Sequence, residues 1–99
     1  QDEQRPVLLI MGGSQGARTL NKATVGALDT LINSLGCCVI HQTGAERYEE
    51  TLSWLPQAFQ QHPRYAFMPF LHHMEVVLAV ADVAVCRSGS LSLSELYTA

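Results

Sequence analysis

The stretch Val7-Leu8-Leu9-Ile10-Met11-Gly12-Gly13 decides the fold of this chain of 99 residues. Its apolar run does not alternate with polar residues, which is typical of a strand buried on both faces of a parallel sheet. After the glycines, apolar residues recur at helical spacing from Leu20 to Leu35, and Gly36 stands where a helix commonly ends. The order strand, glycine loop, helix therefore predicts the first unit of an α/β fold.

The rest of the chain repeats this strand-helix unit. We predict further strands at residues 37–40, 65–68 and 83–86, each of them an apolar run. Helices are predicted after the turn Thr43-Gly44, along 74–81 and along 91–99, with Pro56 ending or kinking the first of them. Because strands that alternate with helices are joined by right-handed crossovers, the sequence predicts a doubly wound parallel sheet.

The composition limits the function classes. The formal net charge is −3 and the chain has no Lys/Arg cluster, so we expect no nucleic-acid partner. Cys37, Cys38 and Cys86 make an odd number of cysteines, which fits a reducing cytosol better than a disulfide framework. The apolar stretches fall short of the roughly 20 residues of a membrane-spanning helix. At this length we expect one domain at most, with residues 1–99 forming an interior fragment without a targeting signal.

Four loops are candidates for a ligand site. Ligands of a doubly wound sheet bind outside the carboxyl ends of its strands, and the loops at Gly12, Gln42, Phe70 and Arg87 each follow a predicted strand. We therefore expect all four at one edge of the sheet.

The first of these loops, residues 12–16, is the strongest candidate for anion binding. It opens a helix and offers small residues and free backbone N–H groups, which favours a phosphate. It lacks both the Walker A ending and the G-x-G-x-x-G spacing, so we expect no dinucleotide cofactor. A tight turn that needs glycine only for its backbone geometry stays an alternative.

The same loop also matches G-x-S-x-G, the nucleophile elbow of the α/β-hydrolases, with Ser14 as the nucleophile. In those enzymes an acid and then a histidine follow the serine, whereas no histidine follows Asp82 in this chain. A hydrolase fragment that has lost its histidine is one alternative function. A non-catalytic module that binds a nucleotide sugar is another.

Residues 87–95 repeat the design of the first loop. A turn containing Gly89 runs into a predicted helix, and Glu95 stands about one turn inside it. The spacing Ser92-x-x-Glu95 is also that of a capping box, in which Glu95 would only satisfy a backbone N–H. Both interpretations of Glu95 stay open on this segment alone.

The histidines and the acidic cluster carry no separate prediction of chemistry. Adjacent His72 and His73 can rarely face one metal ion, and His41 fits an inward structural role better than a ligand role, so we assign no metal. Residues 46, 49 and 50 are glutamates that fit the first turn and solvated face of a helix.

Taken together and in order, the loops resemble those of the MurG family of bacterial glycosyltransferases. The resemblance covers nearly the whole chain, and an ordered set of motifs is far more specific than the single hydrolase match. The matching segments are Gly12-Gly13-Ser14-Gln15-Gly16-Ala17-Arg18, His41-Gln42-Thr43-Gly44, Pro69-Phe70-Leu71-x-x-Met74, Ala81-Asp82, and Arg87-Ser88-Gly89 through Ser94-Glu95-Leu96.

The resemblance implies a fold and an activity. The family has two doubly wound domains facing across a cleft, the GT-B arrangement, and residues 1–99 resemble part of its C-terminal, Rossmann-like domain. The implied reaction moves N-acetylglucosamine from UDP-GlcNAc to lipid-linked muramyl-pentapeptide, lipid I to lipid II, in peptidoglycan synthesis, with inversion and without a metal. The family works at the cytoplasmic face of the bacterial plasma membrane, which implies a peripheral location. The acceptor and the general base would belong to an N-terminal domain, so no residue here is assigned a catalytic role and the chain alone is expected to be inactive.

The resemblance also implies donor-binding roles at the four loops. Phe70 and Leu71 would border the uracil, with backbone groups of Leu71 meeting its edge, and Glu95 would accept hydrogen bonds from the ribose. The remaining residues would lie near the diphosphate or the sugar: Gly13, Ser14, Gln15, Gly16, Ser90, Leu91 and Ser92. Ser90 and Ser92 stand where the family usually has Ala and Thr, and further donor contacts of the family fall beyond Ala99.

Overall fold

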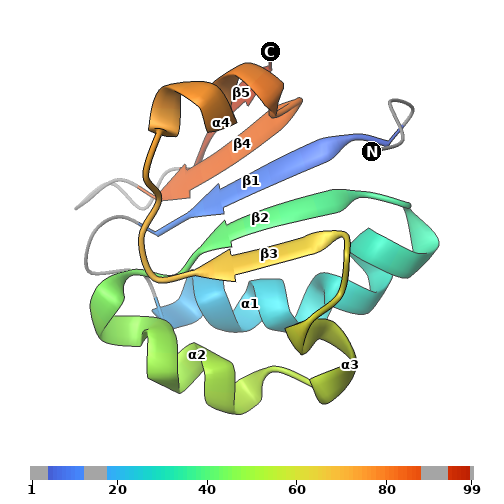
Figure 1. The fold of residues 1–99 in the computed structure, drawn as a ribbon, viewed down its shortest axis with the longest axis vertical. Coiled ribbons are helices and arrows are strands. Elements are labelled where there is room, and N and C mark those ends of the chain that lie inside the picture. The colour runs from blue at the N-terminus through green and yellow to red at the C-terminus, as the bar shows by residue number, and fades with distance from the viewer. Residues whose placement is uncertain (1–4, 13–17, 88–93, 99) are drawn as a thin grey trace.

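One mixed sheet organises the molecule. The computed structural model describes residues 5–12, 18–87 and 94–98, and the sheet that they form has the strand order β3-β2-β1-β4-β5 (Figure 1). The first four strands run parallel and the fifth is antiparallel. Their bounds are β1 Val7–Met11, β2 Cys38–Gln42, β3 Tyr65–Met68, β4 Val83–Arg87 and β5 Ser94–Thr98. The predicted parallel α/β fold is confirmed.

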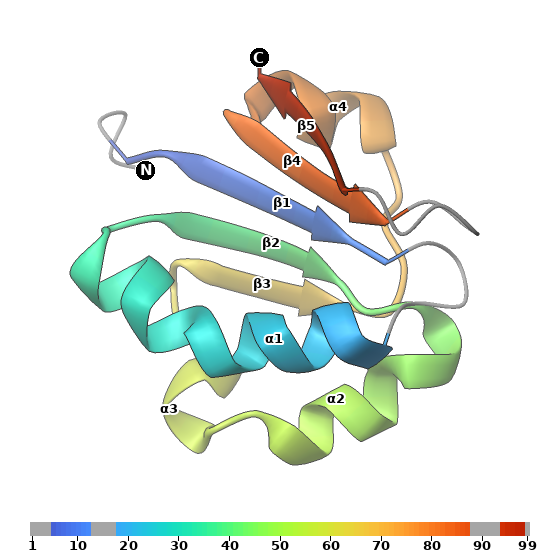
Figure 2. The same cartoon turned by 180° about the vertical axis from the view of Figure 1, so that it is seen from behind.

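Helices lie on both faces of this sheet, as a doubly wound fold requires. The helices that follow β1 and β2 lie together on one face, and the helix that connects β3 to β4 lies on the other (Figures 1 and 2). The helical segments are α1 Arg18–Leu28, its π-helical continuation η1 Asp29–Ser34, the 3-10 turn η2 Ala45–Arg47, α2 Tyr48–Trp54, α3 Gln57–Gln60 and α4 Met74–Val80. No helix in the described ranges is long and apolar enough to cross a membrane.

The two residues predicted to end helices, Gly36 and Pro56, do so in the structure. Gly36 ends the first helical stretch with φ +73°, a conformation that favours glycine. Pro56 separates α2 from α3, since Leu55 closes α2 and Pro56 is the N-cap of α3. β2 begins at Cys38 rather than at the predicted Cys37, because the Cys37 amide still donates to the Leu31 carbonyl of the preceding helix.

Both faces of the sheet carry core residues. Leu9 and Ile10 are neighbours on β1, so their side chains point to opposite faces, and their exposed fractions are 0% and 4%. Ile10 packs with Leu28 and Ile32 in the larger cluster, on the face covered by α1, α2 and α3. Leu9 packs with Ala84 in a smaller cluster beneath α4. Burial on both faces is what the non-alternating apolar run predicted.

The helix predicted along 91–99 is wrong for the described part of that segment. Residues 94–98 form β5, which pairs antiparallel with β4 so that Glu95 lies opposite Cys86. Leu96-Tyr97-Thr98 has two residues of high strand propensity, and β5 satisfies the backbone groups of the outer edge of β4, which would otherwise be exposed. Edge pairing therefore outweighs the capping-box spacing that favoured a helix. Residues 91–93 and 99 lie outside the described residues.

Candidate functional site

The carboxyl ends of the four parallel strands lie at the same edge of the sheet. Met11 at the end of β1 pairs with both Gln42 and Cys86, and Gln42 pairs with Met68. The predicted positions Gly12, Gln42, Phe70 and Arg87 therefore lie at the same edge of the sheet, to which the arrowheads of these strands point in Figure 2. The single-edge prediction is confirmed, and this edge is the candidate site.

The end of β2 is the most tightly bonded part of this edge. His41 has an exposed fraction of 0%, and both of its ring nitrogens form hydrogen bonds on the α1 face of the sheet. Nδ1 lies 2.8 Å from the Tyr65 hydroxyl, and Nε2 lies 2.9 Å from Asn21 Oδ1. Burial lowers the pKa of His41 from 6.5 to about 4, so the imidazole is neutral near pH 7. Burial, and then the nearby Tyr48, raise the pKa of the Tyr65 hydroxyl.

The direction of each bond in this network follows from the chemistry of its groups. Asn21 Nδ2 donates to the Thr43 carbonyl at 2.9 Å, which fixes the orientation of the amide and leaves Oδ1 as an acceptor. His41 Nε2 must then carry the proton and donate, and Nδ1 accepts from Tyr65. Both ring nitrogens are engaged, so His41 is a structural residue and is not available as a base. The inward structural role predicted for it is confirmed.

The next residue of β2 reaches the other face of the sheet. Gln42 has an exposed fraction of 5%, and its Oε1 accepts a hydrogen bond of 2.8 Å from the Leu71 backbone N–H. The Leu71 amide is thus engaged within the chain, so of the two backbone groups of Leu71 predicted to meet the uracil edge, the carbonyl is the one that this bond does not occupy. Thr43 and Gly44 continue the pairing with the end of β3, since their amides donate to the Met68 and Pro69 carbonyls.

Phe70 and Leu71 are the predicted donor-binding residues that the structure describes in full. The Phe70 side chain is 51% exposed, and its ring meets His72 edge-on at a centroid distance of 5.7 Å. Leu71 is half-buried and packs against the cluster beneath α4. An exposed aromatic ring held between bonded neighbours offers a flat surface on which a ring-shaped ligand can stack.

The other predicted donor-binding residues are placed only in part. Glu95 lies in β5 rather than in a helix, so a helix-capping role does not apply to it. Its predicted contact with ribose stays a prediction. The remaining residues lie outside the described residues: Gly13, Ser14, Gln15, Gly16, Ser90, Leu91 and Ser92.

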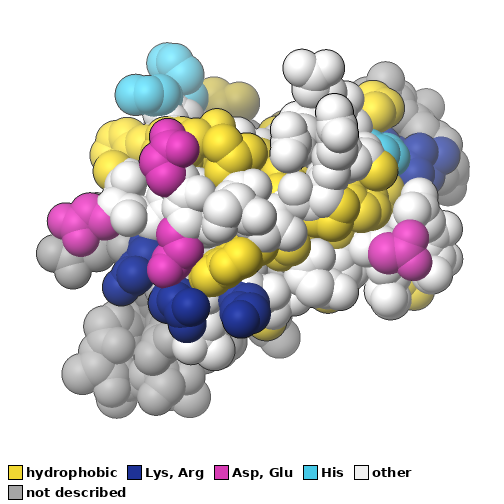
Figure 3. All heavy atoms as spheres, turned by 90° about the horizontal axis from the view of Figure 1, so that it is seen from below, with side chains coloured by type: hydrophobic (Ala, Val, Ile, Leu, Met, Phe, Trp, Pro, Cys, Tyr) yellow, Lys and Arg dark blue, Asp and Glu magenta, His cyan; other side chains and the backbone are white. Residues whose placement is uncertain are grey.

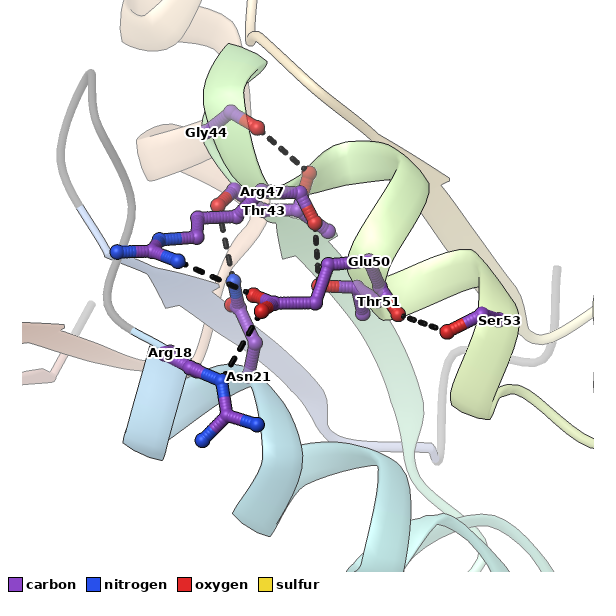
Figure 4. Close-up of polar contacts among 8 residues, drawn as sticks. All are labelled: Arg18, Asn21, Thr43, Gly44, Arg47, Glu50, Thr51 and Ser53. Carbon is purple, nitrogen blue, oxygen red and sulfur yellow. Dashed lines mark hydrogen bonds and ion pairs between the residues drawn. The ribbon is translucent and has the colours of Figure 1, made fainter.

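A charged cluster lies beside the start of α1 and joins this helix to α2. Glu50 accepts from Arg18 Nε at 3.0 Å and from Arg47 at 3.3 Å, which ties α1 to α2 (Figure 4). Arg18 and Lys22 both lie over the Trp54 ring, at 5.2 and 5.3 Å from its centroid. Figure 3 shows basic side chains gathered at one end of the face that α1 and α2 form. Glu49 and Glu50 lie in the first turn of α2, as predicted, and Glu50 in addition bridges two arginines at the surface.

A cavity of about 520 Å³ lies at the opposite, amino-terminal edge of the sheet. The starts of β1, β2 and β3 line it, together with Arg5, Arg64 and Val80 of α4. In the described ranges, α4 is the one helix on the sheet face opposite α1, α2 and α3. Two of its residues, Val76 and Val80, are more than half exposed. The cavity thus follows from incomplete cover of the sheet, and the carboxyl edge remains the candidate site. No group of three or more potential metal ligands occurs among the residues described.

Sequence reasoning missed Asn21 and the Gln42–Leu71 contact. Asn21, Thr24 and Leu28 are the buried residues of α1, and this spacing was a usable signal for Asn21 because it places the asparagine on the core-facing stripe. The Gln42 contact has no comparable signal, since it joins residues 29 apart in the chain.

The fold defines a doubly wound α/β domain with a candidate ligand site at the carboxyl edge of its parallel strands. The chain belongs to the family described as glycosyltransferase family 28 C-terminal domain, whose model matches residues 7–99. This membership overturns the α/β-hydrolase alternative with Ser14 as nucleophile, because the first loop is part of a glycosyltransferase domain.

Individual relatives agree with the family. The chain is 39% identical over 96% of its length to an Acidothermus cellulolyticus protein named UDP-N-acetylglucosamine–N-acetylmuramyl-(pentapeptide) pyrophosphoryl-undecaprenol N-acetylglucosamine transferase, and 41% identical over 96% to a Corynebacterium jeikeium protein of the same name. Among solved structures, it resembles MurG of Acinetobacter baumannii, with 30% identity and a TM-score of 0.68 over 92% of the chain. The chain spans about a quarter of the length of each of these proteins.

Proposed function

We propose that this chain is the donor-binding part of an inverting glycosyltransferase that moves N-acetylglucosamine from UDP-GlcNAc to lipid-linked muramyl-pentapeptide in peptidoglycan synthesis. The observation that carries the proposal is the family match over residues 7–99, combined with relatives named for this transfer at about 40% identity. The common edge of the four loops supports it, because a sugar nucleotide needs base, ribose and diphosphate contacts close together.

The chemistry proposed for this edge is electrostatic. The acceptor hydroxyl attacks the anomeric carbon of the donor, the bond from that carbon to the diphosphate oxygen breaks, and UDP leaves with the added negative charge. Gly12 is followed by the loop that opens α1, so backbone N–H groups and the helix dipole would face that charge. Donors that are already oriented stabilise developing charge without reorganisation, which is how such a site works without a metal.

The partners of the reaction lie partly outside this chain. The lipid-linked acceptor and the group that removes its proton are assigned to an N-terminal domain that faces this one. A peripheral position on the cytoplasmic face of the plasma membrane follows from the lipid acceptor. The chain by itself is proposed to bind the donor weakly and to transfer nothing.

The test compares the chain with a complete polypeptide that contains it. Calorimetric titration of the chain with UDP, and with ADP as the control, is expected to show a preference for UDP. Transfer of radiolabelled N-acetylglucosamine to a lipid-linked acceptor is expected from the complete polypeptide and not from the chain. Equal binding of UDP and ADP would contradict the proposal, and UDP binding without transfer by the complete polypeptide would identify a non-catalytic nucleotide-sugar-binding module instead.

A further inference from the structure

Gln42 joins the end of β2 to the loop that follows β3. The last backbone bonds between these strands run from Thr43 to the Met68 carbonyl and from Gly44 to the Pro69 carbonyl. Beyond them the chain leaves the sheet, and the next tie to β2 is the hydrogen bond from the Leu71 amide to Gln42 Oε1, at 2.8 Å. A side chain thus continues the strand pairing where the backbone stops.

Phe70 lies between these two ties. Pro69 before it is held through its carbonyl by Gly44, and Leu71 after it is held through its amide by Gln42. The Phe70 ring itself is 51% exposed, so packing against the core does little to fix it. The position of this ring is therefore set mainly by the backbone on either side.

The Gln42 side chain is suited to this task. It is 5% exposed and its partner Leu71 is half-buried, so their hydrogen bond is costly to break, because a buried acceptor left without a partner loses its hydration without compensation. It also lies next to His41, which is fixed on the opposite face by Tyr65 and Asn21. The backbone that carries Gln42 is thus anchored independently of the loop that Gln42 holds.

We propose that Gln42 is a positioning residue for nucleotide binding: it holds the Phe70-Leu71 segment so that the exposed Phe70 ring stands ready to stack on the base of a uridine nucleotide. The inference rests on the proposed function and assigns part of its donor affinity to a residue that need not touch the ligand. A surface that is ordered before binding loses less conformational entropy when the ligand arrives, which raises affinity. Only the acceptor oxygen of Gln42 is required for this role.

Two substitutions separate the acceptor from the rest of the side chain. Gln42→Met keeps the length of the side chain and removes the acceptor, whereas Gln42→Glu keeps an acceptor oxygen whether its carboxyl group is ionised or protonated. Thr24→Val is the matched control, since it removes a hydrogen bond that is likewise part-buried, from Thr24 Oγ1 to the Leu20 carbonyl, in a helix away from the loop.

The first readout is independent of any ligand. Amide hydrogen exchange followed by NMR should show Leu71 exchanging about 3- to 10-fold faster in Gln42→Met, the size expected for the net contribution of one hydrogen bond. Gln42→Glu should keep the slow exchange of Leu71, and Thr24→Val should leave it unchanged. Unchanged Leu71 exchange in a folded Gln42→Met variant would overturn the proposal.

The second readout is the affinity for UDP, measured by calorimetry on the same variants. The Kd should rise about 3- to 10-fold in Gln42→Met and return close to its original value in Gln42→Glu. Should Gln42→Met fail to fold, the comparison of Gln42→Glu with the unsubstituted chain still decides, because a large loss of affinity there would contradict a role that needs only an acceptor. UDP binding that Gln42→Met leaves unchanged overturns the positioning role alone, whereas absence of UDP binding by the unsubstituted chain overturns the proposed function and the positioning role together.

Discussion

Asn21 and His41 share a hydrogen bond of 2.9 Å between two side chains that are both fully buried, one on α1 and the other on β2. Asn21 also donates to the Thr43 carbonyl, so one amide joins the helix after the glycine loop to the end of the neighbouring strand. Each group in the network acts as a donor or as an acceptor in a fixed direction. Replacing a donor by an acceptor, or an acceptor by a donor, would therefore leave a buried polar atom unsatisfied.

Asn21→Ala is accordingly expected to destabilise the fold by about 2–4 kcal/mol, because it leaves both the His41 Nε2–H and the Thr43 carbonyl without a partner in the core. Urea unfolding followed by circular dichroism measures the free energy of unfolding. Asn33→Ala is the control: Asn33 donates to Asp29 on the exposed side of the helical stretch, and its loss should change stability by less than about 0.5 kcal/mol. Equal losses of unfolding free energy in the two variants would show that the buried network stabilises the fold no more than an exposed hydrogen bond does.

The stability of the fold should fall as the pH drops from about 6.5 to about 4. The pKa of His41 is lowered to about 4 in the folded state, whereas the unfolded chain takes up this proton near 6.5. Between these values the unfolded state binds more protons, so acidification favours it, with a total loss of about 3 kcal/mol for a shift of this size. Above pH 6.5 His41 is neutral in both states and contributes no pH dependence.

NMR titration of the imidazole resonances checks the cause directly. The signals of His41 should stay those of a neutral ring down to about pH 4. A His41 signal that titrates near 6.5 in the folded protein would contradict the burial of this ring and the direction of its hydrogen bonds.

Replacement by alanine should change the stability in opposite directions at two glycines, Gly26 inside α1 and Gly36 just after η1. Gly36 has φ +73°, and a Cβ added there would lie 3.3 Å from the Arg5 guanidinium, so Gly36→Ala should cost about 1–2 kcal/mol. Gly26 lies inside α1 with nothing within 4 Å of an added Cβ, so Gly26→Ala should stabilise the fold by about 0.4–1 kcal/mol. Thermal unfolding of both variants measures the difference, and a stabilising Gly36→Ala would contradict the left-handed turn.

Glu95 is expected to contribute to donor affinity. In a complete polypeptide that contains this chain, Glu95→Ala should weaken UDP-GlcNAc binding by about 1.5–3 kcal/mol, the range for hydrogen bonds to a charged group, if this carboxylate accepts from the ribose hydroxyls. The free energy of unfolding should change much less, since β5 pairs with β4 through backbone groups that the substitution keeps. Unchanged donor affinity would remove Glu95 from the site.

Local chemistry explains which elements the sequence predicts well. Tyr65–Met68 is a short apolar run closed by Pro69, and β3 has these bounds because proline cannot continue the ladder. The position of the four loops at one edge of the sheet was also predictable, because parallel strands place their carboxyl ends at the same edge. These features depend on residues close together in the chain.

The features that were missed or wrong depend on distant partners. Residues 94–98 form a strand only because β4 offers an edge to pair with, and a polar turn followed by a capping-box spacing does not report that edge. Asn21 looks like an ordinary polar residue of a helix until His41 and Thr43 are placed beside it. Residues 13–17 and 88–93, which hold most of the predicted phosphate contacts, lie outside the described residues, so those contacts stay predictions.

His41 and Gln42 are neighbours on β2 and point to opposite faces of the sheet, so β2 cannot gain or lose one residue before His41 without exchanging these two faces. Because neighbouring side chains point to opposite faces, inserting or deleting one residue between Val39 and His41 would turn the imidazole toward α4 and the amide toward α1. The imidazole would lose Asn21 and Tyr65, and Leu71 would lose its acceptor, in one step. Insertions and deletions should therefore be tolerated better in the turn 61–63, between α3 and β3, than in β2.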